Sequence, residues 1–163
     1  MSHIKFPVTP AIRLLRAQKI LFTPHLYSFE EHGGTQHAAR SLEVPEHAII
    51  KTLIFENDAR KPFIVLMHGD CEVSLKQLAR ELGVKRVLPC EIKAAEKYTG
   101  YRVGGISPFG TRTALPVHAE ASIFSLKRIY INGGKRGFLV EMAPENLQNV
   151  FPVIQVHAAI SNH

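Results

Sequence analysis

The sequence contains only two cysteines, Cys71 and Cys90, and they are too far apart to form a CxxC pair. This scarcity argues against a disulfide framework and a zinc knuckle, and it favours a reducing compartment. No apolar run approaches the roughly 18 residues that a membrane-spanning helix needs. The stretch 1–10 also lacks the apolar centre of a secretory signal. We therefore expect a cytoplasmic protein with no membrane association.

The chain also lacks internal repeats, low-complexity tracts and linkers, so its 163 residues predict a single domain over 1–163. With 45% hydrophobic residues, it is long enough to bury one core without a metal or a disulfide. The formal charge is +6, from 20 Lys and Arg against 14 Asp and Glu. This balance favours polyanionic partners such as nucleic acid, although many soluble proteins are mildly basic without a specific reason.

Capping residues and amphipathic spacing predict five short helices. Ser74 and Gln77 form a capping box, and the helix that follows closes at Gly83. Thr9 can accept a bond from a free backbone N–H at the start of another helix. The remaining helices are predicted to begin at Thr35 after a Gly33-Gly34 loop, to run over 91–98 with an end at Gly100, and to start at Pro144.

Two apolar, β-branched runs at 49–56 and 62–68 predict paired strands at the centre of a sheet, joined by the polar turn 57–61. Further strands are expected over 22–29 and 153–156, together with a hairpin of 128–131 and 138–142 whose tip is 132–137. Helices and strands alternate without a strict βαβ order. We therefore predict an α+β fold, a single compact domain with a mixed, largely antiparallel and partly barrel-like sheet flanked by short helices.

Standard catalytic and metal-binding motifs are absent from the sequence. Nine histidines are present, yet none belongs to an HExxH, HxH or Cys-His cluster. His32 and His37 are five residues apart, which suits no common pair of helical ligands, so surface or loop positions are favoured. Cys71 has no local base beside it in the sequence and is predicted to be inert. The sequence therefore predicts no metal and no cofactor.

The segment 103–110 has an unusual composition, because three glycines and a proline occur within eight positions. Such a backbone either approaches another group closely or turns sharply. Its N–H groups could hold an oxyanion or a ribose oxygen, whereas a plain connecting turn is an equally good interpretation. No GKS or GKT follows, so the segment is not a P-loop.

Lys51 lies inside the apolar run predicted to form a central strand. Its side chain either snorkels from the strand or points into a cavity that binds an anionic ligand, and snorkelling is the commoner case. Lys135 and Arg136, at the predicted hairpin tip, could bind phosphate. Solvated turn charges are the alternative interpretation for these two residues.

Several ordered motifs together resemble the YbaK/EbsC family of aminoacyl-tRNA deacylases, relatives of the editing domain inserted in bacterial prolyl-tRNA synthetases. They are TPAIRLL at 9–15, KTL at 51–53, TGYRVGGISPFG at 99–110 and IYINGGKRG at 129–137. The resemblance spans nearly the whole chain. It implies a pocket that receives the 3′-terminal adenosine of a charged tRNA together with its amino acid.

The resemblance also implies roles for individual residues. Lys51 would bind the terminal phosphate or ribose oxygens, and the amides of Gly104 and Gly105 would position the ester carbonyl. The further substrate-binding residues that it implies are Tyr27, Thr35, Ile106, Ser107, Pro108, Asn132, Lys135 and Arg136. Two positions depart from the family pattern, because Asn132 replaces a common Ser and Leu139 replaces an Asp found in some members.

The implied activity is trans-editing hydrolysis of a mischarged aminoacyl-tRNA, with Cys-tRNA(Pro) or a similar small amino acid on tRNA(Pro) as the leading substrate. An aminoacyl ester is already activated, so positioning can suffice without a protein nucleophile. The partners implied are the 3′ acceptor end of aminoacyl-tRNA and prolyl-tRNA synthetase. A non-catalytic module that binds tRNA or a synthetase, and a basic metabolite-binding domain, stay open as alternatives.

Overall fold

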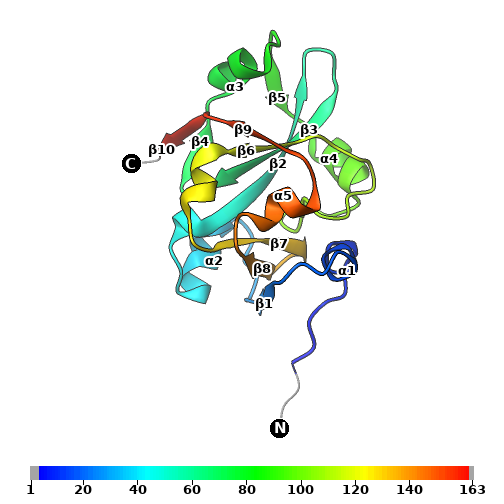
Figure 1. The fold of residues 1–163 in the computed structure, drawn as a ribbon, viewed down its shortest axis with the longest axis vertical. Helices are drawn as coiled ribbons and strands as arrows, with labels where there is room; N and C mark the ends of the chain where they lie inside the picture. The colour runs from blue at the N-terminus through cyan, green and yellow to red at the C-terminus, as the bar shows by residue number, and fades with distance from the viewer. Residues whose placement is uncertain (1–3, 162–163) are drawn as a thin grey trace.

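Strands β2 (Ile49–Asn57) and β3 (Pro62–His68) form the antiparallel centre of the sheet, as their apolar runs predict. The protein is described over residues 4–161 by a computed structural model (Figure 1). The sheet order is β1-β8-β7-β2-β3-β6-β9, and β5 also pairs with β2. The other strands of this sheet are β1 (Thr23–Leu26), β5 (Val87–Pro89), β6 (Val117–Glu120), β7 (Ile129–Lys135), β8 (Phe138–Met142) and β9 (Val153–Val156).

The sheet is mixed, which confirms the predicted α+β class. β2 runs parallel to β7, and β6 runs parallel to both β3 and β9, whereas the remaining pairs are antiparallel. A separate antiparallel pair joins β4 (Cys71–Val73) to β10 (Ala159–Ser161). Over residues 4–161 the path from β1 to β9 is open, so the partly barrel-like character stays a prediction.

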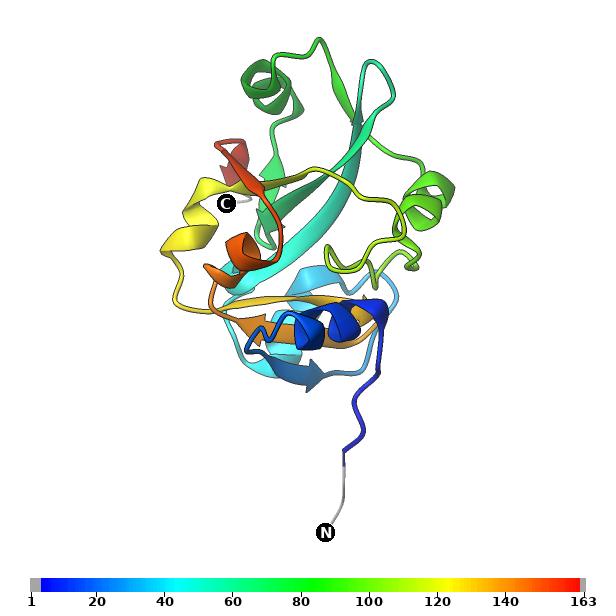
Figure 2. The ribbon, with the colours of Figure 1, turned by 45° about the vertical axis from the view of Figure 1, so that its right-hand side comes forward.

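Short helices surround the sheet. They are α1 (Pro10–Ala17), α2 (Gly34–Leu42), α3 (Leu75–Leu82), α4 (Ile92–Thr99) and α5 (Asn146–Val150), with 3-10 turns η1 (Glu46–Ala48) and η2 (Ala121–Ser125). Figures 1 and 2 show α1 beside β7 and β8 at one end of the molecule, and α3 with β5 at the other. Within residues 4–161, none of the helices has the length and apolar character that crossing a membrane requires.

Two of the predicted helix caps form as expected. The Thr9 hydroxyl accepts a bond from the Ile12 N–H at 3.1 Å, and the Ser74 hydroxyl accepts one from the Gln77 N–H at 3.1 Å. Gly83 ends α3 with a left-handed φ of 68°. Only half of the predicted capping box is present, because the Ser74 N–H donates to the carbonyl of Ala158 in the chain leading to β10.

The predicted cap at Thr35 is wrong, since α2 begins one residue earlier, at Gly34, with Gly33 as its N-cap. The Thr35 hydroxyl lies 2.7 Å from a Glu46 carboxylate oxygen and 3.1 Å from the Gly69 carbonyl oxygen. In these contacts the hydroxyl is directed toward distant segments as a donor, and α2 has no side-chain cap bond. The last helix likewise begins at Asn146, two residues after the predicted Pro144.

The strand boundaries differ from prediction at two places. The strand expected over 22–29 covers only Thr23–Leu26. In the hairpin, β7 continues to Lys135 through a bulge, so only Arg136 and Gly137 remain between the strands and the predicted tip at 132–137 is too long. Asn132 and Lys135 pair with Leu139 and Phe138, and the bulge accommodates the two glycines between them.

β2 contributes side chains to three apolar clusters, which explains why its sequence is apolar on both faces. Ile50 and Ile54 belong to the largest cluster, Phe55 packs beneath α3, and Ile49 packs beneath α2 with Leu139. Burying apolar surface is the main favourable term in folding. This strand therefore fixes the sheet on which the candidate site is built.

Candidate active site

The candidate site lies where the central strand is left open along one edge. On that edge, Ile49 and Ile50 pair with β7, and residues 55–57 pair with β5. Between these two pairings, within the part of the chain described, no strand pairs with β2 on this side. The middle of β2, at 51–53, is accordingly only half-buried although the strand is central. A gap in strand pairing thus exposes backbone and side chains to a cavity.

Thr52 presents polar groups to this gap. The Ile54 carbonyl oxygen accepts a bond from the Cys90 N–H on the β5 side, so the backbone of Ile54 points away from β3. Backbone direction alternates along a strand, so the amide and carbonyl of Thr52 point to the same edge. The Thr52 hydroxyl is buried and has no hydrogen-bond partner among the described residues. A buried, unsatisfied hydroxyl is costly and calls for a physical explanation.

The cavity beside this edge has a volume of about 350 Å³. Its walls are largely apolar, and the polar groups among them are few. The lining side chains come from the β1–α2 segment, β2, α4, the glycine-rich loop and the hairpin, and they include Tyr27, Phe29, Thr35, His37, Ile49, Lys51, Thr52, Leu53, Cys90, Ile92, Gly104, Ile106, Asn132 and Leu139. A small apolar cavity with a few fixed polar groups is typical of a small-molecule site.

Lys51 lines the cavity and is half-buried. Its ammonium donates a hydrogen bond to the Cys71 carbonyl oxygen at 2.5 Å. An ammonium group carries three donors, so this bond fixes the head of the side chain and leaves donors for a ligand. Of the two interpretations of Lys51, its position favours the one in which the side chain reaches a cavity.

Gly104 and Gly105, two of the three glycines of the loop, are explained by close packing against the hairpin. A Cβ atom on Gly105 would lie 2.7 Å from the backbone nitrogen of Arg136, and Gly104 has a left-handed φ of 93°. The Gly105 N–H already donates to the carbonyl of Arg102. Gly104 lines the cavity, whereas Gly105 is not among the lining residues. Close approach and a sharp turn therefore both occur in this loop.

The other predicted residues of the loop divide into two groups. Ile106 lines the cavity and is half-buried. Ser107 is fully buried, and its hydroxyl accepts a bond from the Phe109 N–H at 3.2 Å, so it stabilises the turn from within. Pro108 is also buried and is not among the lining residues. Only Ile106 of these three is positioned to contact a ligand in the cavity.

Tyr27 and His37 form one side of the cavity. Their rings meet edge to face with centroids 5.8 Å apart, and burial raises the pKa of the Tyr27 hydroxyl. The His37 Nε2 lies 2.6 Å from the Ser28 carbonyl oxygen, which accepts the bond. Tyr27 and Thr35 were identified from the family resemblance. His37 was not predicted to line the cavity, because its spacing from His32 suits no common pair of ligands.

Lys135 and Arg136 lie outside the main cavity, around a second, more polar depression of about 490 Å³ that shares Tyr27 with it. The Arg136 guanidinium donates to the Val103 carbonyl at 2.9 Å and lies over the Phe29 ring, 5.0 Å from its centroid. Arg136 therefore holds the loop and the hairpin together. Lys135 is exposed beside it and adds positive charge to the second depression.

Neither cysteine is placed as an activated nucleophile. Burial, together with the charge of Glu56, raises the pKa of the Cys90 thiol in the cavity to about 11. Burial, with Asp70 beside it, also raises the pKa of the Cys71 thiol. A protonated thiol is a poor nucleophile. The arrangement is suited to binding and orienting a substrate through Lys51, Thr52 and backbone groups.

Comparison with known proteins reveals relatives across most of the chain. A family model described as the aminoacyl-tRNA editing domain matches residues 30–150. EbsC of Enterococcus faecalis, a proposed Cys-tRNA(Pro)/Cys-tRNA(Cys) deacylase, is 31% identical over 138 residues, which cover 84% of each chain. The proline–tRNA ligase of Limosilactobacillus fermentum is 27% identical over 120 residues, covering 71% of this chain but only 20% of the ligase.

Solved structures share the same fold. The hypothetical protein APE2540 superposes with a TM-score of 0.85 at 22% identity, covering 93% of this chain and 100% of that one. A proposed trans-editing enzyme for prolyl-tRNA synthetase gives a TM-score of 0.80 at 18% identity, covering 95% of this chain and 100% of that one. At these identities the two structures show the fold alone.

Proposed function

The chain belongs to the aminoacyl-tRNA editing domain family, and from this premise we propose that it hydrolyses the ester bond of a mischarged aminoacyl-tRNA in trans. The observation that carries the proposal is the cavity of about 350 Å³ on which Lys51, Thr52 and Gly104 converge. The remaining walls are mostly apolar side chains that limit the size of the bound group.

In this proposal the tRNA enters with its 3′-terminal adenosine, and Lys51 binds the terminal phosphate or ribose oxygens. The ammonium is held by the Cys71 carbonyl, so little side-chain entropy is lost when the substrate binds. The Gly104 amide positions the ester carbonyl. Gly105 acts indirectly, because its own N–H is bonded to Arg102 and its role is to let the loop approach the hairpin.

Thr52 is the third source of polar groups in the cavity, besides Lys51 and the Gly104 amide. Its buried hydroxyl and the open edge of β2 provide hydrogen-bonding groups that a bound aminoacyl-adenosine can satisfy. Tyr27, Thr35 and Ile106 form the adjacent walls, with Asn132 at the hairpin side. Lys135 and Arg136 bind the phosphates that precede the terminal adenosine, as the polar depression beside the cavity favours.

Ester cleavage in this proposal needs no protein nucleophile. An aminoacyl ester held in a productive orientation is attacked either by a water molecule or by a group of its own amino acid, such as a cysteine thiol. The raised pKa of the Cys90 thiol supports this, because the thiol in the cavity stays protonated near neutral pH. The protein supplies orientation and stabilises charge on the carbonyl oxygen.

The proposed substrate is Cys-tRNA(Pro) or another small amino acid on tRNA(Pro). The small volume of the cavity and the name of EbsC both favour this choice. The relatedness to a segment of proline–tRNA ligases favours prolyl-tRNA synthetase as a partner and the cytoplasm as the place of action. Asn132 and Leu139, the two departures from the family pattern, both line the cavity, and they motivate the alternative of a module that binds tRNA without hydrolysis.

Hydrolysis of a panel of labelled Cys-, Ala-, Ser- and Pro-tRNAs by the purified chain tests the proposal. We expect release of a small, non-cognate amino acid at rates well above spontaneous hydrolysis, with correctly charged Pro-tRNA the least affected. Tight, salt-sensitive binding of tRNA without turnover would favour the binding module instead. Absence of both turnover and tRNA binding at low salt would favour a metabolite-binding domain.

A further inference from the structure

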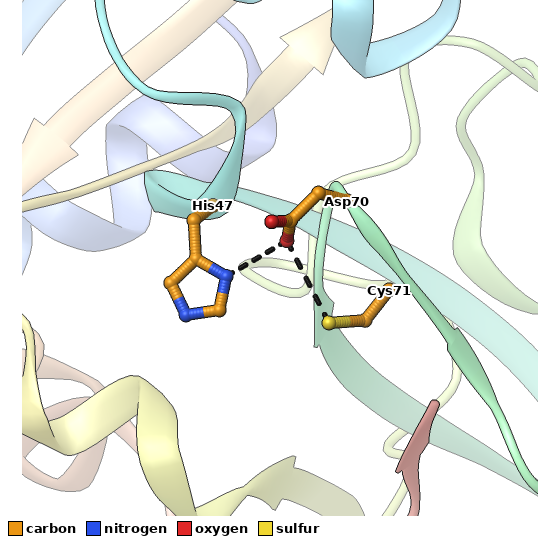
Figure 3. Close-up of side chains that lie close together, drawn as sticks. All are labelled: His47, Asp70 and Cys71. Carbon is orange, nitrogen blue, oxygen red and sulfur yellow. Dashed lines mark hydrogen bonds and ion pairs between the residues drawn. The ribbon is translucent and has the colours of Figure 1, made fainter. Parts of the chain in front are cut away.

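A second cluster of reactive side chains adjoins Lys51, whose ammonium bonds to the Cys71 carbonyl. Figure 3 shows His47, from η1, together with Asp70, from the turn between β3 and β4, and Cys71, the first residue of β4. Their ligand atoms all lie within 4.8 Å of one another. Cys71 therefore has polar side-chain partners that local sequence could not reveal, because His47 is 24 positions away from it.

We propose that His47, Asp70 and Cys71 form a binding site for a divalent metal of the zinc class. Imidazole nitrogen, carboxylate oxygen and thiolate sulfur are the three donors that Zn²⁺ prefers. Three protein ligands leave the fourth position of a tetrahedral ion open to water. This proposal revises the expectation of no metal, and it is separate from the ester hydrolysis proposed above.

Two of the three separations between ligand atoms fit such an ion with small movements, and the third, between His47 and Cys71, is within 4.8 Å. The Cys71 Sγ lies 3.6 Å from Asp70 Oδ1, close to the separation of about 3.6 Å between a sulfur and an oxygen on tetrahedral zinc. The His47 Nδ1 lies 2.8 Å from the same oxygen, so it must withdraw to about 3.4 Å. The His47 side chain is 44% exposed, which gives it room to move and leaves the metal a path from solvent.

Neighbouring contacts hold the ligands in place. The His68 ring stacks on the His47 ring with centroids 3.7 Å apart and planes within 6°. His68 is itself fixed by the His47 carbonyl at 2.8 Å and the Ser122 hydroxyl at 2.7 Å. The Cys71 backbone is held by Lys51 and by pairing with Ser161. Such outer contacts orient metal ligands and strengthen binding.

The chemistry of the unliganded cluster also supports the assignment. Asp70 Oδ1 contacts both the His47 Nδ1 and the Cys71 thiol. This one carboxylate oxygen therefore keeps the other two metal-binding atoms close together. When the metal binds, a metal–sulfur bond replaces the S–H bond and the thiol proton passes to solvent. A metal bond at the His47 Nδ1 leaves Nε2 to carry the ring hydrogen. The thiolate and the carboxylate then balance the two charges of the ion.

Titration of the chelator-treated full chain with Co²⁺, a spectroscopic substitute for Zn²⁺, tests the proposal. We expect visible bands of a tetrahedral cobalt ion and a near-ultraviolet sulfur-to-cobalt charge-transfer band, both saturating at equimolar metal. Added Zn²⁺ should remove these bands. Cys71→Ser should lose the charge-transfer band, and His47→Ala should weaken binding by at least about tenfold.

Cys90→Ser is the matched control, because Cys90 is the other thiol of the chain and is not part of the cluster. It should retain the spectrum and affinity of the original chain. Circular dichroism checks that each variant is folded, and the half-exposed His47 makes His47→Ala the safer variant. Absence of the charge-transfer band in the original chain, its persistence in Cys71→Ser or unchanged affinity in His47→Ala would overturn the proposal.

Discussion

Asn132 and Leu139 lie directly opposite each other across β7 and β8, and both line the cavity. The Asn132 side chain bonds on both sides, since its oxygen accepts from the Gly134 N–H at 2.6 Å and its Nδ2 donates to the Gly104 carbonyl at 3.3 Å. Asn132 therefore connects the hairpin to the glycine-rich loop, whereas Leu139 closes the wall with apolar surface. The two departures from the family pattern thus form one wall of the cavity.

Leu139→Ala should enlarge the cavity and move the preference toward larger amino acids. Removing apolar contact from a pocket changes discrimination by about 1–3 kcal/mol, which corresponds to roughly tenfold or more. The ratio of kcat/KM for Cys-tRNA to that for a bulkier aminoacyl-tRNA measures this change. Leu21→Ala, at an 85% exposed leucine, is the control for the same chemical change. An unaltered ratio in Leu139→Ala would argue against this wall as the determinant of size.

Thr52→Val should separate stability from function. Valine keeps the shape of threonine but removes the buried hydroxyl that has no partner, so the free energy of unfolding should be unchanged or raised by about 1 kcal/mol. Deacylation should fall, because the hydroxyl would then be missing from the substrate site. Urea unfolding and single-turnover hydrolysis give the two readings. Full activity in this variant would mean that the Thr52 hydroxyl does not contact the substrate.

Gly105→Ala should disturb the site through the backbone. A Cβ atom there meets the backbone of Lys135 and Arg136 at 2.7 to 2.8 Å, and overpacking of this kind costs about 1–3 kcal/mol. Thermal unfolding and hydrolysis rates should both decline. Gly83→Ala is the comparison, since its left-handed φ of 68° costs about 1–2 kcal/mol but no atom lies within 4 Å of the added carbon. The comparison variant should lose stability only.

Helices and strands were predicted correctly where their capping residues or apolar runs lie within the element itself or next to it in the sequence. Ser74 and Gly83 bracket α3, and the apolar runs of β2 and β3 identify the centre of the sheet. Strand β6 escaped prediction because it contains His118 and Glu120, whose polar character hides a fully buried strand that pairs with distant partners. Strands of three residues, such as β4 and β10, carry too little periodicity to detect.

Residues of the candidate site were predicted only where they belong to a motif of the family. Lys51 and Gly104 were identified by family resemblance, and both reach the cavity. The open edge of β2 depends on where two distant strands stop pairing, and no local pattern encodes that register. Thr35 shows the opposite error, because its local capping signal was outweighed by bonds to Glu46 and Gly69.

Stability should fall as the pH is lowered, with a contribution from His118. Burial lowers the pKa of this imidazole from its ordinary 6.5, partly offset by the bond to the Ile64 carbonyl. The unfolded chain therefore binds a proton at a higher pH than the folded chain does. The stabilisation is complete above about pH 6.5 and is lost as the pH falls toward the folded pKa. Urea unfolding between about pH 7.5 and 5.5 should show a smaller loss in His118→Gln; an equal loss would contradict this assignment.

The most direct test of the proposed function compares Lys51→Met with Lys61→Met in single-turnover hydrolysis of mischarged tRNA. Methionine keeps an apolar stem but removes the ammonium from the cavity, whereas Lys61 is exposed and precedes β3. We predict that Lys51→Met lowers the rate by at least about a hundredfold on every active substrate, while Lys61→Met leaves it nearly unchanged. Rates in folded Lys51→Met equal to those of the original chain would contradict the central role of Lys51.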